Sequence, residues 1–182
     1  MKFPAAFQMT TDVAHIARSA FSDRFAAPAA FTVRAPGRVN LIGEHTDHND
    51  GFVMPMAIDR WTAIALGPRG DDRVVLHSLV MASSGEFSLR ELAPGKFGGW
   101  PDYAHGVAGA MAGAGFALRG WEGVVAGDVP AGAGLSSSAS FELAVARAFA
   151  ALCDGARMAR LCQRATRLRQ SIVQKAFTGQ LA

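Results

Sequence analysis

Several features are scarce or missing in these 182 residues, and each absence excludes a class of protein. Only two cysteines, Cys153 and Cys162, are present, and no CxxC pair occurs, so neither a disulfide framework nor a cysteine-based metal site is expected. We expect two reduced, buried thiols. No apolar run reaches the ~18 residues of a membrane helix, and the N-terminus lacks the continuous apolar core of a signal peptide. These absences favour a cytoplasmic protein without membrane contact.

Negative charge is missing from the end of the chain. Residues 1–156 contain twelve basic and fifteen acidic residues, whereas residues 157–182 contain six basic residues and no acidic one. The basic isoelectric point of about 9.3 therefore arises from the last segment. Such asymmetry indicates a tail with a separate role or a separate origin.

What is present fits a folded domain, since half of the residues are hydrophobic and 18% are charged. Residue patterns and breakers predict helices and strands in a mixed order without a regular βαβ period, which favours an α+β fold. The expected helices span residues 11–21, 101–111, 137–152 and 156–177. The expected strands span residues 31–36, 62–66, 73–78, 86–89 and 121–130, with loops at 37–51 and 131–134.

A glycine- and serine-rich loop lies between the last expected strand and an apolar helix. Gly132 and Gly134 allow the backbone to turn sharply and to approach a ligand closely. Ser136, Ser137 and Ser138 place hydroxyl groups and free amide groups at the helix start, where the helix dipole is positive. This arrangement suits an anion such as a nucleotide phosphate. On spacing alone, an ordinary serine-capped helix after a turn remains the alternative.

The string P-x-x-x-G-L-S-S-S-A, from Pro130 to Ala139, resembles the nucleotide-binding motif of the GHMP kinases. These small-molecule kinases include galactokinase, homoserine kinase and mevalonate kinase, and the loop is not a Walker A loop because no Gly-Lys-Ser/Thr is present. The resemblance implies ATP and Mg²⁺ as cofactors, with Ser137 or Ser138 near the metal and Ser138 as our candidate. The implied ATP-binding residues of this loop are Gly132, Gly134, Leu135, Ser136, Ser137 and Ser138.

A second polar cluster occupies residues 44–50. Carboxylate, imidazole and amide groups suit the hydroxyls of a sugar, because carboxylates accept two hydrogen bonds at once. Arg38, upstream, could stabilise a transferring phosphoryl group or lower the pKa of a nearby acid. From the residues alone, a solvated loop and a metal site at His45, Asp47 and His48 remain open.

The string GRVNLIGEHTDHNDGFVMPMAI resembles the galactokinase signature. The resemblance implies that Glu44, His45 and Asp47 bind galactose hydroxyls and that Arg38 is catalytic at the C1 hydroxyl. It also implies that Trp100 and Tyr103, in WPDY, flank the adenine of ATP. For these two aromatic residues, core packing at i and i+3 on a helix is the alternative.

The resemblance extends from about residue 8 to about residue 165. The catalytic aspartate of the family lies in a Met-Asp-Gln segment that does not occur in this sequence. Residues 166–182, TRLRQSIVQKAFTGQLA, instead resemble a helical segment of the specificity subunit of type I restriction enzymes. We therefore expect three parts: an N-terminal segment (1–30), an incomplete galactokinase N-terminal domain (31–165) and a foreign basic helix (166–182).

The implied fold is the GHMP-kinase N-terminal domain, of the ribosomal protein S5 domain 2-like type. The implied reaction is ATP-dependent phosphorylation of α-D-galactose at C1, performed weakly or not at all by this truncated chain. Galactose and ATP are the expected partners, and we expect a monomer that binds neither membranes nor nucleic acid. Two alternatives are a DNA-associated module acting through the basic tail and a related kinase for N-acetylgalactosamine.

Overall fold

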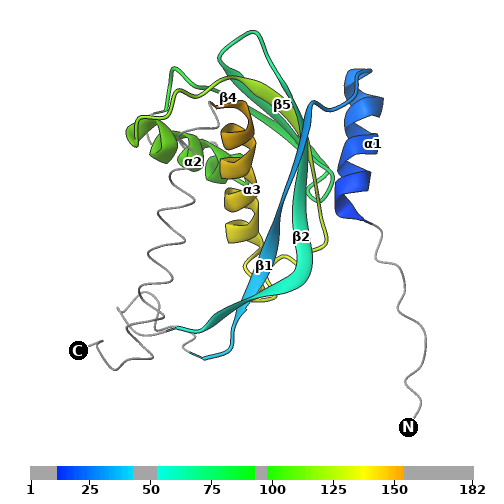
Figure 1. Cartoon of the computed structure of the whole chain (residues 1–182), viewed down its shortest axis with the longest axis vertical. Helices are drawn as coiled ribbons and strands as arrows, with labels where there is room; N and C mark the ends of the chain where they lie inside the picture. The colour runs from blue at the N-terminus through cyan, green and yellow to red at the C-terminus, as the bar shows by residue number, and fades with distance from the viewer. Residues whose placement is uncertain (1–11, 43–52, 93–97, 154–182) are drawn as a thin grey trace.

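In the computed structural model, residues 12–42, 53–92 and 98–153 are described, and they form one five-stranded sheet with helices on both faces (Figure 1). The strand order is β1-β2-β5-β3-β4. Strands β3 and β5 pair in parallel, and the other neighbours pair antiparallel. The strands are β1 (Phe31–Asn40), β2 (Pro55–Pro68), β3 (Arg73–Ser78), β4 (Ser83–Ser88) and β5 (Trp121–Gly127).

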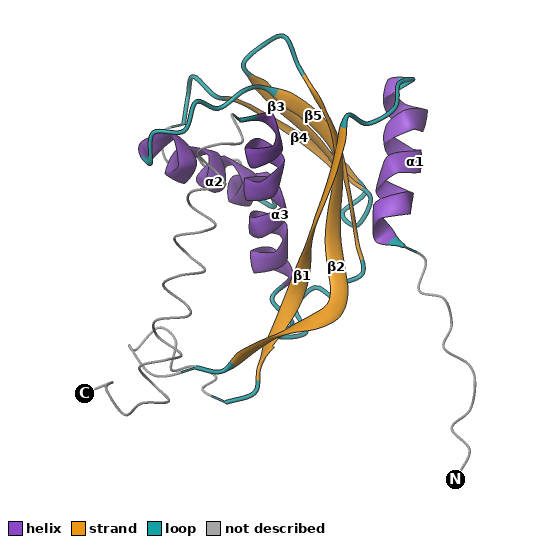
Figure 2. Cartoon of the chain, in the orientation of Figure 1, coloured by secondary structure: helices purple, strands orange, loops and turns teal. Residues whose placement is uncertain are grey.

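The two faces of the sheet carry different cores, as the middle of strand β2 illustrates. Ala63 and Ala65 belong to the cluster under helix α1, whereas Ile64 and Leu66 belong to the cluster under helices α2 and α3. Alternation across the strand explains this division. Because helices cover both faces (Figure 2), the middle of β2 is apolar without interruption.

Three helices complete the fold: α1 (Val13–Phe25), α2 (Pro101–Gly113) and α3 (Ser137–Leu152). All three confirm the expected elements, and α3 has the expected bounds. Helix α1 is longer than expected and ends at Phe25, and the capping residue Ala26 adopts a left-handed conformation with φ of 51°. Pro101 begins α2, where its missing amide N–H costs nothing. None of the helices in the described ranges has the length and apolar character needed to cross a membrane.

Residues 37–40 of the expected loop belong to strand β1, which continues to Asn40, and strand β2, expected from residue 62, already begins at Pro55. These extensions pair with each other beyond the helices, and Leu41 and Met54 prolong the ribbon with a 2.9 Å backbone hydrogen bond. Most side chains of the β2 extension are exposed, and Arg38, Val39 and Asn40 of the β1 extension are half-buried. The hydrophobic pattern that marks buried strands is therefore missing, which explains the error.

Two further expectations need correction. Strand β4 starts at Ser83 rather than at residue 86, because its serines and glycine pair along the whole of β3 despite their low strand propensity. Cys153 is half-buried rather than buried, and its thiol donates to the Ala117 carbonyl at 3.2 Å. Burial raises the pKa of this thiol. Cys162 and the helix expected over residues 156–177 lie outside the described residues.

Candidate nucleotide and sugar site

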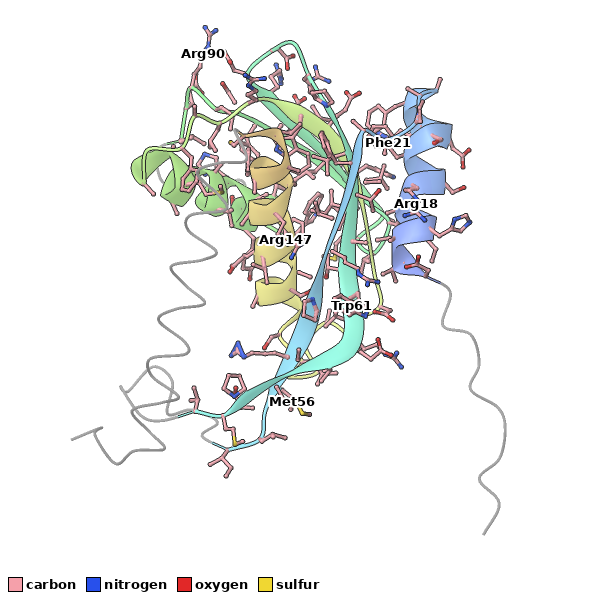
Figure 3. All side chains as sticks on the ribbon, in the orientation of Figure 1. Arg18, Phe21, Met56, Trp61, Arg90 and Arg147 are labelled. Atoms are coloured by element: carbon pink, nitrogen blue, oxygen red, sulfur yellow. The ribbon has the colours of Figure 1, made fainter. Side chains whose placement is uncertain are left out.

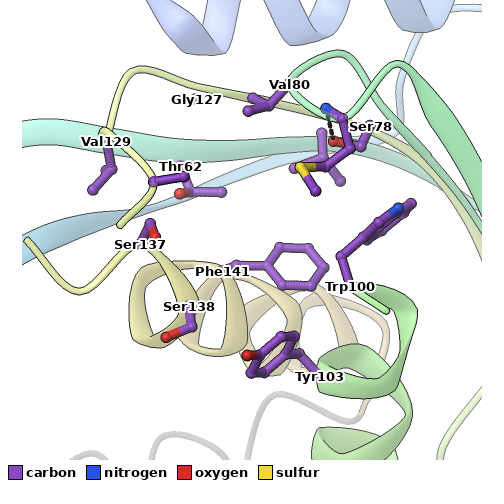
Figure 4. Close-up of a pocket in the computed structure, with 13 residues that line it drawn as sticks. Thr62, Ser78, Val80, Trp100, Tyr103, Gly127, Val129, Ser137, Ser138 and Phe141 are labelled. Atoms are coloured by element: carbon purple, nitrogen blue, oxygen red, sulfur yellow. Dashed lines mark hydrogen bonds between the residues drawn. The ribbon is translucent and has the colours of Figure 1, made fainter. Parts of the chain in front are cut away.

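A cavity of about 210 Å³ lies between the start of helix α3, the start of helix α2 and the sheet (Figure 4). Its apolar side contains Val80, Met81, Trp100 and Phe141, and its polar side contains hydroxyl groups of Ser137 and Ser138. The remaining lining residues are Thr62, Ser78, Tyr103, Val125, Gly127, Val129 and Ala131. Because no lining side chain carries a charge, a bound anion would depend on amide groups, hydroxyls and the dipole of α3.

The two aromatic residues singled out from the sequence both line this cavity. The indole nitrogen of Trp100 donates to Ser83 Oγ at 2.9 Å, and its ring meets Phe141 edge-on with centroids 5.8 Å apart. Trp100 also packs against the edge of the core, so core packing describes part of its surroundings. Tyr103 is 46% exposed, so its ring remains accessible to a ligand.

The loop before helix α3 depends on left-handed backbone conformations. Gly132 and Gly134 have φ of 73° and 72°, which only glycine adopts without cost. Ser136 also has a positive φ of 58°, at a cost of about 1–2 kcal/mol for a residue with a side chain. Ser136 makes no side-chain capping bond, so the serine-capped helix considered from the sequence does not describe its geometry. The first amide groups of α3 have no partner within the helix and can bind an anion.

Both ends of this loop are fixed to the sheet. At its start, the amide N–H of Asp128 donates to the Trp61 carbonyl at 3.1 Å, and Asp128 Oδ1 accepts from the Trp61 amide at 2.6 Å. At its end, the Leu135 carbonyl accepts from the Arg38 amide at 3.1 Å. The structure therefore brings the backbone of Arg38 into contact with the serine loop, although the two are almost a hundred residues apart in the sequence.

Ser140 is a residue that the sequence reading missed. It is 2% exposed, and its Oγ lies 2.9 Å from both the Ala35 carbonyl and Thr62 Oγ1. Because a hydroxyl has one proton, Ser140 donates to Ala35 and accepts from Thr62. A signal was available, since Ser140, Ala144 and Ala148 form a stripe of small residues at helical spacing, which indicates close packing of α3 on the sheet.

The sugar-loop candidates Glu44, His45 and Asp47 lie outside the described residues, as does His48. Arg38 lies at the end of strand β1 that leads into this loop. Within residues 12–42, 53–92 and 98–153, no group of three or more His, Cys, Asp or Glu side chains is arranged to hold a metal ion.

Comparison with known families agrees with this arrangement. Residues 19–68 match the family model of the galactokinase galactose-binding signature, and residues 102–177 match that of the GHMP kinases N terminal domain. The chain therefore has the fold of the GHMP-kinase N-terminal domain, as expected from the sequence.

Among individual proteins, most of the chain is similar to the N-terminal part of curated galactokinases over 131 to 135 residues. Curated galactokinases of Chloroflexus aurantiacus and Roseiflexus sp. (strain RS-1) are each 46% identical, over 131 and 135 residues. The matches cover 72% and 74% of this chain and 34% of each relative. The chain thus spans about a third of the length of the curated relatives that it matches.

Solved structures give the same result. The Lactococcus lactis galactokinase in complex with galactose superposes with a TM-score of 0.62 at 36% identity, covering 70% of this chain and 34% of that chain. The Methanococcus jannaschii mevalonate kinase superposes with a TM-score of 0.57 at 23% identity. This match covers 67% of this chain and 40% of the mevalonate kinase chain. The second likeness supports the fold alone.

Proposed function

We propose that this chain carries the nucleotide- and galactose-binding part of a galactokinase, an enzyme that transfers the γ-phosphoryl group of ATP to the C1 hydroxyl of α-D-galactose. One observation carries the proposal: Trp100, Tyr103, Ser137 and Ser138 line one cavity, and the backbone of Arg38 is hydrogen-bonded to the serine loop beside it, at Leu135. The similarity of residues 19–68 to the galactose-binding signature supports the choice of sugar.

The nucleotide would lie across the cavity. Its base would stack in the apolar part beside Trp100 and Tyr103, because a flat aromatic ring suits an uncharged, partly aromatic wall. Its phosphates would contact the amide groups of the loop from Gly132 to Ser137 and the positive end of α3. Ser138, which is exposed at the cavity, would help to hold the Mg²⁺ that accompanies the phosphates.

The sugar would be bound by Glu44, His45 and Asp47, whose acceptors and donors match vicinal hydroxyls. Arg38 would stabilise the negative charge that develops on the transferring phosphoryl group. Catalysis of this kind consists mainly of positioning and electrostatic stabilisation. The partition into segments 1–30, 31–165 and 166–182, the monomeric state and the cytoplasmic location remain parts of this proposal.

For the 182-residue chain by itself, we expect little or no turnover. The relatives contain about twice as much additional sequence as this chain matches, and no Met-Asp-Gln segment supplies the implied base. General acid–base catalysis alone contributes about 10²–10⁴-fold. A coupled assay of ADP release with galactose checks this expectation, and a rate within the ~1–100 per second usual for kinases would contradict it.

Nucleotide binding is tested by calorimetric titration of the full chain with the ATP analogue AMPPNP and with ADP, each with and without Mg²⁺. We expect Ser138→Ala to weaken the affinity for Mg²⁺-AMPPNP by about tenfold or more, the scale of a lost contact around a metal ion. Metal-free ADP should bind wild type and variant equally. Ser19→Ala, an exposed serine on helix α1, is the matched control.

The outcomes separate the parts of the proposal. A folded wild-type chain that does not bind AMPPNP would contradict the nucleotide site itself. Unchanged affinity of Ser138→Ala for Mg²⁺-AMPPNP would contradict only the metal assignment, and Ser137→Ala would then be the variant to measure.

Sugar binding is tested separately by titration with galactose and with N-acetylgalactosamine. We expect galactose to bind, and Asp47→Asn to weaken its affinity far more than Asp50→Asn, which makes the same chemical change in the same loop. Equal effects of the two substitutions would contradict the assignment of Asp47. Tighter binding of N-acetylgalactosamine than of galactose would redirect the proposal to that sugar.

A further inference from the structure

The contact between strand β1 and the serine loop lies at an irregularity in the pairing of β1 with β2. The pairing of β1 with β2 shifts register between Pro36 and Arg38, so that the single residue Gly37 on β1 lies opposite three residues of β2, Ile58 to Arg60. At this irregularity, the Arg38 amide donates to the Leu135 carbonyl at 3.1 Å instead of only continuing the ladder. The bulged strand is therefore β2, which bends locally opposite Gly37.

No side chain fits at position 37 while this contact exists. A Cβ atom on Gly37 would lie 2.9 Å from the Leu135 carbonyl oxygen, 3.1 Å from Val129 Cγ1 and 3.2 Å from Ile58 Cδ1. The closest of these atoms belongs to the backbone, which cannot move aside as a flexible side chain can. Gly37 is therefore required for the close approach of the loop to β1.

A second attachment lies on the other side of Gly37. The buried Ser140 hydroxyl donates to the carbonyl of Ala35, two residues before Gly37, and accepts from Thr62 on strand β2. The Ala35 carbonyl and the Arg38 amide thus hold the first turn of α3 and the preceding loop from both sides of Gly37. The end of the loop next to α3 is therefore held by β1, the strand that leads into the candidate sugar loop, while its start is held by Trp61 on β2.

We propose that Gly37, Leu135 and Ser140 are positioning residues that hold the serine loop at one place on strand β1 and thereby couple nucleotide binding to Arg38. The inference rests on the proposed function. A nucleotide that orders residues 132–137 also fixes the Leu135 carbonyl. This carbonyl accepts a hydrogen bond from the backbone of Arg38, the residue proposed to stabilise phosphoryl transfer. Coupling of this kind is reciprocal, so ordering of Arg38 by the sugar would favour the nucleotide equally.

The first experiment compares two glycine substitutions in the full chain by titration with Mg²⁺-AMPPNP. Gly37→Ala should weaken binding by about 5- to 150-fold, the usual range for coupling between sites. Gly67→Ala is the matched control, because its Cβ would meet the ring of Phe21 at 3.2 Å, under helix α1 on the opposite face of the sheet. We expect the Gly67→Ala affinity to stay within about twofold of wild type, whatever stability is lost.

The second experiment measures hydrogen exchange of the Arg38 amide by NMR, with and without Mg²⁺-AMPPNP. In wild type, the nucleotide should slow this exchange, because it fixes the acceptor carbonyl. In Ser140→Ala, one of the two attachments is lost, and the nucleotide should slow the exchange less. This variant keeps the inference testable if Gly37→Ala does not fold.

Each outcome bears on one claim. Absence of AMPPNP binding by folded wild type would overturn the proposed function and this inference with it. If wild type binds but Gly37→Ala binds equally well, or if Gly67→Ala is weakened to the same extent, only the inference is overturned. The same holds if nucleotide binding leaves the exchange of the Arg38 amide unchanged.

Discussion

At the scale of single residues, His77 shows how a side chain outside the site responds to its surroundings. It lies on strand β3, and its Nδ1 is 2.9 Å from Ser84 Oγ on strand β4. Burial, and secondly the positive charge of Arg24, hold the pKa of this imidazole below its ordinary value of 6.5. The folded state therefore favours the neutral ring.

This lowered pKa predicts the direction of a pH dependence. Below about pH 6.5 the unfolded chain takes up a proton at His77 before the folded chain does, so this contribution to stability is present above that pH and is lost as the pH falls. The loss should stay below ~1.4 kcal/mol for each pH unit, the limit for one proton. Urea unfolding at pH 7.5, 6.5 and 5.5 measures it. His77→Gln should reduce the slope of the free energy of unfolding against pH, and an unchanged slope in this variant would contradict the prediction.

The residues of the site differ in how far the sequence revealed them. The loop glycines and serines were singled out by type and spacing, and Trp100 and Tyr103 by the resemblance to galactokinases. Trp100, Tyr103, Ser137 and Ser138 all line one cavity. Thr62, Ser78 and Phe141 line the same cavity but belong to ordinary strand and helix patterns. Their role depends on which elements face each other, and local sequence does not contain that information.

At the scale of elements, helix α1 is held at its start by a side chain and along its length by packing. Asp12 Oδ1 accepts from the Ala14 amide at 3.1 Å, which satisfies a donor that has no partner within the helix. Ala17 and Phe21 are buried against strands β2 and β5, and Phe21 points from the helix toward the sheet (Figure 3).

Removal of the capping side chain should therefore lower the stability of the protein measurably without changing its affinity for ligands. We expect Asp12→Ala to lower the free energy of unfolding by about 1 kcal/mol. Asp12→Asn keeps a capping oxygen and should stay within a few tenths of a kcal/mol of wild type. Urea unfolding monitored by circular dichroism measures both variants. Equal losses in the two would show that the charge rather than the cap is what matters.

At the scale of the whole molecule, the sheet is covered on both faces only over part of its length. Strands β1 and β2 continue beyond the helices as a ribbon, with Met56 on the exposed part (Figure 3). We call the end of this ribbon the apolar tip. It consists of Leu41, Ile42, Val53, Met54 and Met56, which are between 38% and 70% exposed. Contiguous apolar surface of this kind promotes association.

A charge placed on the apolar tip should reduce self-association while leaving the fold intact. Ile42 is 70% exposed, so Ile42→Glu should change the free energy of unfolding by less than ~0.5 kcal/mol. We expect light scattering of concentrated protein to show less association for this variant than for wild type. Ile16→Glu on helix α1, at a residue 36% exposed, is the control. An equal decrease of self-association in Ile16→Glu would show that the effect comes from net charge rather than from the apolar tip.

The sequence by itself determined the order and type of the described elements, because their burial creates patterns that are local. It also determined the serine loop, because positive φ values at Gly132 and Gly134 require glycine. The strand extensions at 37–40 and 55–61 were not predictable, since their side chains are half-buried or exposed and carry no regular apolar alternation.

Only the tertiary structure decided that the serine loop docks on strand β1. The contact joins a carbonyl at Leu135 to an amide at Arg38, and the Ser140 hydroxyl to a carbonyl at Ala35. Every residue except proline offers such backbone groups, so their partners cannot be read from residue types. The partners are set by the sheet register and by the packing of α3, which bring together segments that are far apart in the chain.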